Sequence, residues 1–141
     1  MFTFTFYPMA VADLKYHDTT GQIIGCAMKV HRYFGPGFPE VVYKRALTIE
    51  LDKIPLSYSL ETERDIFYED QMIGKRRLDL LVEQNILVEL KALIEIDRSC
   101  FAQIINYLRV FNIQVGLLLN FGSASLQFKT SINTKQSVKS F

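Results

Sequence analysis

The chain has 141 residues, enough for one domain with a hydrophobic core and too few for two. Hydrophobic residues make up 49% of it, with many tyrosines and phenylalanines, which excludes a disordered chain and indicates a packed globular protein. The net charge of +1 excludes a protein that coats DNA through its overall charge, so any contact with nucleic acid must come from a local basic patch.

The N-terminal segment, residues 1–15, lacks a helical period, and we expect it to be an extension outside the folded domain. Both Met1 and Met9 are candidates for the natural start. The segment lacks the basic region of a signal peptide, and nowhere does the sequence hold the run of about 20 apolar residues that a membrane span needs. We therefore expect a cytoplasmic protein without membrane contact. Cys26 and Cys100 lack metal-ligand spacing and are expected to be buried thiols.

A first helix is predicted to begin at Thr19 or Thr20, with a threonine as its cap. His31 lies beside the apolar face of this helix, and we interpret it as a packing histidine, with a catalytic role as the alternative. The core face has apolar residues at helical spacing: Ile23, Ala27, Val30 and Phe34.

The segment Gly35–Pro39 ends the first helix, and its last proline suits the first turn of a second helix, from Glu40 to about Leu51. Glu40 shares a face with Tyr43 and Leu47. The helix dipole alone would favour a carboxylate in the first turn. Helix propensity does not explain the two glycines and two prolines before it. They restrict the backbone where the helix begins, which is expected if the position of the Glu40 side chain matters.

The remaining elements follow from apolar alternation, turn residues and one amphipathic stretch. The order helix, helix, three strands, helix, strand, strand predicts an α/β or α+β fold with a sheet covered by helices on at least one face. We expect the domain to span residues 16–132 and residues 133–141 to form a tail. The predicted elements are strands over Tyr58–Tyr68, Gln71–Glu83 with a bulge near Gly74, and Ile86–Ile94, a helix capped by Asp97 or Ser99 with its core face on Cys100, Ile104, Leu108 and Phe111, and strands over Val115–Phe121 and Leu126–Ile132.

Charged residues interrupt the apolar second and third strands. Strand alternation places Asp79, Glu89 and Lys91 on one face, among Leu81, Leu87 and Leu93, and Leu78, Leu80 and Val82 on the other. Two carboxylates and an ammonium among leucines are costly to bury unless they pair or hold a metal. The alternative is a surface hairpin with an ion pair.

The pairing register follows from the length of the turn. Residues directly opposite one another in an antiparallel pair point to the same side, so Asp79 can face Glu89 only if the loop has an odd number of residues. The simplest such loop is Glu83–Asn85. A two-residue loop would place Asp79 opposite Leu90 instead, unless a bulge intervened.

The residue types suit metal-assisted chemistry on phosphate. Carboxylate oxygens are the ligands that Mg²⁺ and Mn²⁺ prefer. A lysine beside them can hold a nucleophilic water and stabilise charge growing on phosphorus. Three consecutive basic residues, Lys75, Arg76 and Arg77, precede this hairpin and are candidates for phosphate contacts, with a solvated turn as the alternative.

An Asp followed ten residues later by Glu-x-Lys resembles the core pattern of the PD-(D/E)XK nuclease superfamily. The chain further resembles its GxxExxY proteins, whose signature is Gly37-Phe38-Pro39-Glu40-Val41-Val42-Tyr43 here. The likeness covers roughly residues 16 to 130, including the segments Arg77–Val82, Val88–Ala92, Gln103–Leu108 and Gly116–Gly122. It implies a restriction-endonuclease-like core with a mixed central sheet. One departure is Leu78, where the superfamily name has a proline.

The resemblance also implies roles for residues. Asp79, Glu89 and Glu40 would be metal ligands, Lys91 would be the catalytic base or position the water, and Mg²⁺ or Mn²⁺ would be the cofactor. Gln103-x-x-x-Tyr107 is similar to the QxxxY element of RecB-like exonucleases, which contacts DNA or the site. Tyr43 would support the site.

Three hypotheses follow for function. The first is a metal-dependent phosphodiesterase acting on DNA, with RNA as a further candidate substrate. The second is an inactive member that binds nucleic acid or a protein partner. The third is an assembly protein that forms a homodimer through the edge strand Leu126–Ile132.

Overall fold

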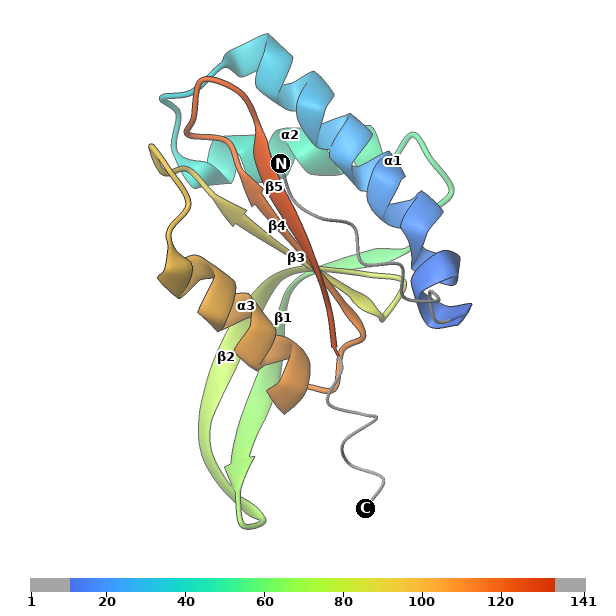
Figure 1. The fold of residues 1–141 in the computed structure, drawn as a ribbon, viewed down its shortest axis with the longest axis vertical. Coiled ribbons are helices and arrows are strands. Elements are labelled where there is room, and N and C mark those ends of the chain that lie inside the picture. The colour runs from blue at the N-terminus through green and yellow to red at the C-terminus, as the bar shows by residue number, and fades with distance from the viewer. Residues whose placement is uncertain (1–10, 134–141) are drawn as a thin grey trace, which may run out of the picture.

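The computed structural model describes residues 11–133 of the chain, and side chains from residue 16 onward. They form a five-stranded sheet with strand order β1-β2-β3-β4-β5 (Figure 1). Strands β3 and β4 are parallel, and the other neighbours are antiparallel. The elements are α1 (Val11–Phe34), α2 (Glu40–Leu51), β1 (Tyr58–Tyr68), β2 (Gln71–Val82), β3 (Ile86–Lys91), α3 (Arg98–Val110), β4 (Val115–Asn120) and β5 (Gln127–Ile132).

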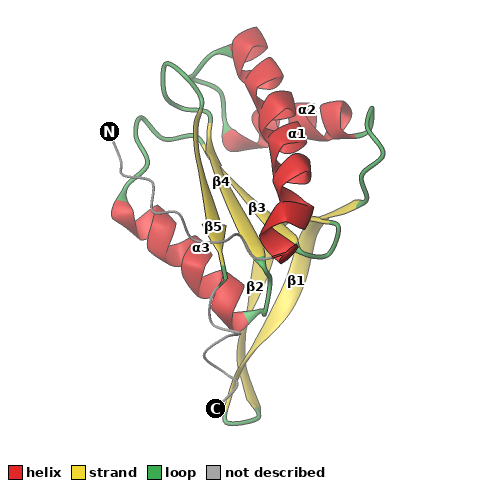
Figure 2. Cartoon of the chain, turned by 45° about the vertical axis from the view of Figure 1, so that its right-hand side comes forward, coloured by secondary structure: helices red, strands yellow, loops and turns green. Residues whose placement is uncertain are grey.

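The helices cover both faces of the sheet, with α1 and α2 on one side and α3 on the other (Figure 2). Helix α3 makes the crossover that the parallel pair β3–β4 requires. Strands β3 and β4 are buried on both faces, which explains their nearly continuous apolar sequence. The predicted α/β architecture and element order are confirmed. None of the described helices is both long and apolar enough to cross a bilayer.

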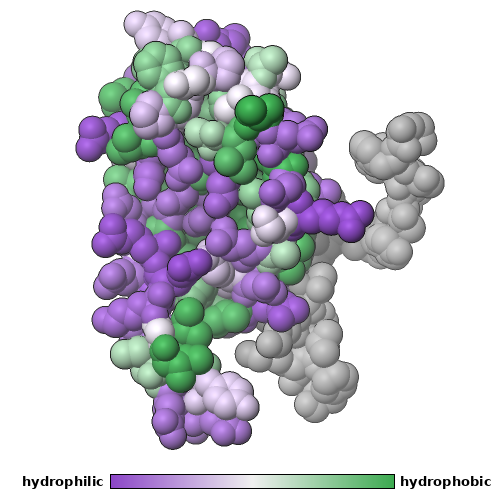
Figure 3. Space-filling view, turned by 90° about the vertical axis from the view of Figure 1, so that its left-hand side faces the viewer, coloured by the Kyte–Doolittle hydropathy of each residue, from purple (hydrophilic) through white to green (hydrophobic). Residues whose placement is uncertain are grey.

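The β1–β2 hairpin extends well beyond the rest of the sheet (Figure 1). Strand β2 pairs with β3 only from Leu80 to Val82, and Leu78 and most residues before it pair with β1 alone. A shift in register leaves Ile73 as the extra residue beside Gly74, where the sequence predicts a bulge. Large apolar side chains are exposed near the tip, in the lower part of Figure 3: Phe67, Tyr68, Met72 and Ile73.

The prediction that the first helix begins at Thr19 or Thr20 is wrong. Helix α1 already begins at Val11, so it includes the last five residues of the predicted extension, while residues 1–10 lie outside the described residues. Thr20 is buried within the helix, and its hydroxyl donates to the His17 carbonyl at 2.9 Å. A hydroxyl bonded to the preceding turn belongs to a helix interior, not to an N-cap.

Several smaller predictions can be compared with the structure. His31, near the end of α1, packs against the segment after β4, with its Nε2 2.9 Å from the Ser123 carbonyl oxygen. Asp97 caps α3 by accepting from the Cys100 N–H.

Both cysteines are free, and Cys26 is only half-buried. Strand β5 lies at a sheet edge, and pairing of two chains through it stays a prediction. Asn133 is held by the carbonyls of Leu108 and Ile113, and residues 134–141 lie outside the described residues.

Candidate active site

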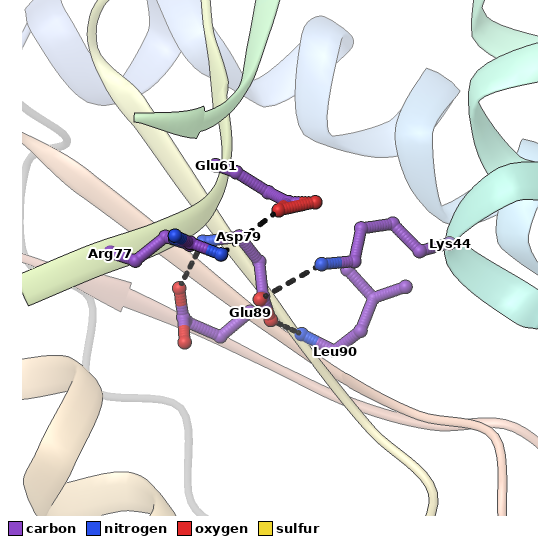
Figure 4. Close-up of polar contacts among 6 residues, drawn as sticks. All are labelled: Lys44, Glu61, Arg77, Asp79, Glu89 and Leu90. Carbon is purple, nitrogen blue, oxygen red and sulfur yellow. Dashed lines mark hydrogen bonds and ion pairs between the residues drawn. The ribbon is translucent and has the colours of Figure 1, made fainter. Parts of the chain in front are cut away.

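Asp79 makes two hydrogen bonds to the neighbouring strand β3, one with Glu89 and one with Leu90. The Asp79 N–H donates to Glu89 Oε2 at 3.0 Å, and the Leu90 N–H donates to Asp79 Oδ2 at 2.9 Å (Figure 4). The pairs Leu80–Val88 and Val82–Ile86 confirm the predicted three-residue loop and the register that directs Asp79 toward Glu89. At Asp79, where the regular pairing of β2 with β3 ends, carboxylate oxygens therefore accept the backbone N–H groups that carbonyl oxygens would accept in a regular sheet.

A local irregularity in β1 accompanies this separation. Glu61, which the register would place opposite Asp79, has a φ of 51° and is not part of the regular pairing. A left-handed backbone at a non-glycine residue is unfavourable and persists only where its surroundings hold it. Glu61 Oε2 lies 3.4 Å from Arg77 Nη1. Strict alternation fails here, because Leu78 packs against α3 whereas Leu80 packs against α1 and α2; the predicted shared face for them is wrong.

The Glu89 carboxyl carries the largest electrostatic perturbation in the site. Its side chain is 7% exposed, and burial raises its pKa to about 7, with a further contribution from the negative charge of Asp79. The hydrogen bond from the Asp79 N–H and the charge of Lys91 oppose this increase. One carboxyl of the pair is thus held with a raised pKa, as expected for two neighbouring acids.

Helix α2 contributes two charged residues from successive turns. Burial and the charge of Asp79 raise the pKa of Glu40, while Lys91 and Lys44 lower it. Lys44 Nζ lies 3.3 Å from Asp79 Oδ1, with side chains 16% and 20% exposed (Figure 4). Sequence analysis did not single out Lys44. Its position four residues after Glu40, on the same helix face, is the signal that could have found it.

Tyr43 fixes the loop that starts α2. Its hydroxyl donates to the Gly35 carbonyl at 2.5 Å and accepts from the Phe38 N–H at 3.1 Å. Its buried ring stacks on Phe121 with 4.7 Å between ring centroids. Gly37 has a φ of 111°, which other residues rarely adopt. The glycine-rich loop and Tyr43 together therefore hold Glu40 beside the carboxylate pair.

Lys91 meets α3 at Gln103. The Lys91 ammonium donates to Gln103 Oε1 at 3.2 Å. This hydrogen bond joins the end of β3 to helix α3. Tyr107, one helical turn later, accepts from Arg76 Nε, and the Arg76 guanidinium lies over its ring. Gln103 is thus placed against Lys91, whereas Tyr107 is placed against the hairpin.

Asn120 positions the segment that follows Lys91, a role that sequence analysis missed. It is fully buried, its Oδ1 accepts from the Leu93 N–H at 2.8 Å, and its Nδ2 donates to the Leu93 carbonyl at 2.9 Å. A Cβ at Gly122 would lie 2.3 Å from that carbonyl, so only glycine permits this approach. The signal in the sequence was an asparagine at the end of an otherwise apolar strand.

The carboxylates suit a hard divalent cation, although they do not form a complete cage. No three His, Cys, Asp or Glu side chains in the described part of the chain are grouped to hold a metal. Mg²⁺ commonly takes only one or two carboxylates and keeps its remaining positions for water and phosphate. A buried pair with one raised pKa gains from a positive charge. The donor chemistry of Asp79 and Glu89 therefore fits Mg²⁺ or Mn²⁺, with Glu40 nearby.

Comparisons with known proteins give one family match and one similar solved structure. The model of the PD-(D/E)XK nuclease superfamily matches residues 17–133. The crystal structure of SSO0001 is similar over 86% of this chain and 62% of that one, with a TM-score of 0.47 and 16% identity. This chain thus spans less than two thirds of that protein. No curated protein matches the sequence.

Proposed function

Because the chain belongs to the PD-(D/E)XK nuclease superfamily, we propose that it is a divalent-metal-dependent phosphodiesterase that cleaves DNA. The observation that carries this proposal is the exchange of hydrogen bonds between Asp79 and the β3 strand at Glu89, with Lys91 two residues further on. Nothing in strand pairing requires two carboxylates in place of a backbone ladder inside a sheet. A pair of carboxylates that binds a cation beside a phosphate would give this arrangement a function.

Each side chain has a distinct task in this proposal. Asp79 and Glu89 would hold Mg²⁺ or Mn²⁺, with Glu40 completing or extending the ligand set. The bound ion would stabilise negative charge on the phosphate and lower the pKa of a water. Lys91 would hold the attacking water and donate to the phosphate oxygen on which charge grows. Gln103 would orient the Lys91 ammonium, since the two already share a hydrogen bond.

Lys44 supplies positive charge to the carboxylate pair when no cation is bound. Its ammonium lies against Asp79 Oδ1 and supplies a positive charge to the pair. In the proposal, Lys44 would give up this contact with Asp79 when a cation is bound, and its ammonium would be free to donate to a phosphate oxygen. The same contact favours a second candidate, an inactive nuclease fold that binds nucleic acid or a protein, because a lysine already neutralises one carboxylate.

A cleavage assay separates the two candidates. The wild type would be incubated with Mn²⁺ and single-stranded, duplex and branched DNA, together with RNA. Lys91→Ala should fold and bind metal, because lysine donates no ligand oxygen, yet lose a factor of about 10² or more in rate. Lys53→Ala, at an exposed ion pair beyond α2, is the matched control and should cleave normally.

Two results would count against the enzyme. If the wild type cleaves nothing on this panel while Lys91→Ala binds DNA equally well, the binding module becomes the better account. If Lys91→Ala unfolds, Lys91 is a structural partner of Gln103 and its proposed role is wrong.

A further inference from the structure

Two arginines face each other across the β1–β2 hairpin. Arg64 and Arg76 are direct partners in the antiparallel register, so their side chains lie on the same side of the hairpin. Like charges in this position destabilise a strand pair. The Arg76 guanidinium lies 5.6 Å from the centre of the Tyr107 ring, which places this side toward α3. We refer to Arg64 and Arg76 as the arginine pair.

The other basic residues of the hairpin are neutralised. Lys75 Nζ lies 4.0 Å from Asp65, and Arg77 Nη1 lies 3.4 Å from Glu61. Neither member of the arginine pair has a carboxylate within this range among the described side chains. The hairpin therefore has a neutralised side and a cationic side.

The arginine pair also retains unused hydrogen-bond donors. Arg64 Nε is buried and makes no hydrogen bond to the described part of the chain. An unpaired buried donor is unfavourable and uncommon in native structures. Arg76 donates through Nε to the Tyr107 hydroxyl, which leaves its terminal nitrogens for another acceptor. Both side chains thus lack an acceptor with negative charge.

The arginine pair is connected to the candidate active site through α3. Tyr107, which holds Arg76, follows one helical turn after Gln103, which holds Lys91. One turn corresponds to about 6 Å along the helix axis for four residues. Successive charges along one nucleic-acid strand are about 3.4 Å apart along the duplex axis. A strand that ran alongside α3 with one phosphate at Lys91 would therefore bring another phosphate, about two nucleotides away, toward the arginine pair.

We propose that Arg64 and Arg76 clamp a backbone phosphate of a nucleic-acid strand that passes from the candidate active site onto the α3 side of the hairpin. Guanidinium groups present paired donors that match phosphate oxygens. One phosphate between them would relieve the repulsion across the strands and accept the unused N–H groups. The assignment rests on the proposed function, because it extends the path of the same strand.

Fluorescence anisotropy of a labelled single-stranded oligonucleotide tests the proposal in EDTA, where cleavage plays no part. The double variant Arg64→Gln/Arg76→Gln is compared with Lys75→Gln/Arg77→Gln, which removes the same charge from the neutralised side. For the arginine variant we expect Kd to rise about tenfold or more at 0.1 M salt. The slope of log Kd against log salt should fall by about 0.7 for each lost contact. The control should change both quantities far less.

The variant Arg64→Lys/Arg76→Lys separates contact from folding. It keeps the charges and the long side chains, so it should retain most of the salt slope while losing the planar donor pairs and part of the affinity. Melting curves of all variants show whether each is folded.

The outcomes also distinguish this proposal from the proposed function. Binding that depends on the arginine pair without any cleavage supports the clamp and contradicts the enzyme. Metal-dependent cleavage with equal losses in the two glutamine variants supports the enzyme and overturns the clamp. A wild type that binds no oligonucleotide, of DNA or RNA, overturns the clamp as well.

Discussion

Glu89 makes the stability of the folded chain depend on pH. Its pKa is about 7 in the folded protein against an ordinary value of 4.5, so the folded state binds a proton more tightly than the unfolded state does. Between these two values the folded state holds more protons, and the free energy of unfolding must fall as pH rises. Above about pH 7, the protein carries the full cost of the buried charge.

This gives a prediction for the chain in EDTA. Urea unfolding of the wild type should show stability decreasing from pH 5 to pH 8 by about 2.5 kcal/mol, at about 1.4 kcal/mol per unit of pKa shift. Glu89→Gln should lose most of that decrease and be the more stable protein at pH 8. The exposed Glu95→Gln should retain the wild-type profile. A flat wild-type profile would show that Glu89 is not buried as described.

The charged residues of the β2–β3 pair were predictable from the sequence. The residues from other elements that contact this region were not. Asp79, Glu89 and Lys91 stand out because charges interrupt an apolar pair of strands. Lys44 and Asn120 reach the site only through packing of α2 and β4. Of the predicted basic residues, Lys75 and Arg77 pair with acids and Arg76 does not, while Arg64 was missed because its partner is 12 positions away across the hairpin.

The start of α2 is the element that most depends on a single side chain. Tyr43→Phe keeps the ring stacked on Phe121 but leaves the Gly35 carbonyl and the Phe38 N–H without their partner. We expect a loss of about 1–3 kcal/mol in urea unfolding. Because Glu40 lies in the first turn of this helix, cleavage should decline as well. Tyr33→Phe, at a tyrosine that is 83% exposed, is the control and should match the wild type. Equal stability of Tyr43→Phe and wild type would show that the loop is held by other contacts.

Elements with a regular alternation of apolar residues were predictable from the sequence, and irregular positions within them were not. Alternation and turn residues located all five strands, and the odd loop length fixed the β2–β3 register. Alternation failed at Leu78, because the left-handed Glu61 and the separation of β2 from β3 at Asp79 break the regular pleat. The start of α1 was missed because threonine resembles a cap in sequence, and only tertiary packing shows that Thr20 is buried inside the helix.

On the scale of the whole molecule, the candidate site exists only where three separate parts of the chain meet. The β2–β3 pair supplies Asp79 and Glu89, α2 supplies Glu40 and Lys44, and α3 holds Lys91 through Gln103. Unfolding would separate these parts, so a cation that binds them at free concentration L should stabilise the folded chain by RT ln(1 + L/Kd), which grows with the logarithm of L once this exceeds Kd.

The most direct measurement is the melting temperature with and without Mn²⁺ at pH 8, above the pKa of Glu89. Saturation at about 100 times Kd should add about 2.7 kcal/mol to the stability of the wild type, a shift of several degrees. Lys91→Ala should show the same shift. Asp79→Asn should show little or none, because a neutral amide replaces the charged carboxylate ligand. A wild type whose melting temperature does not respond to Mn²⁺, or an equal response in Asp79→Asn, would contradict a metal site at this carboxylate pair.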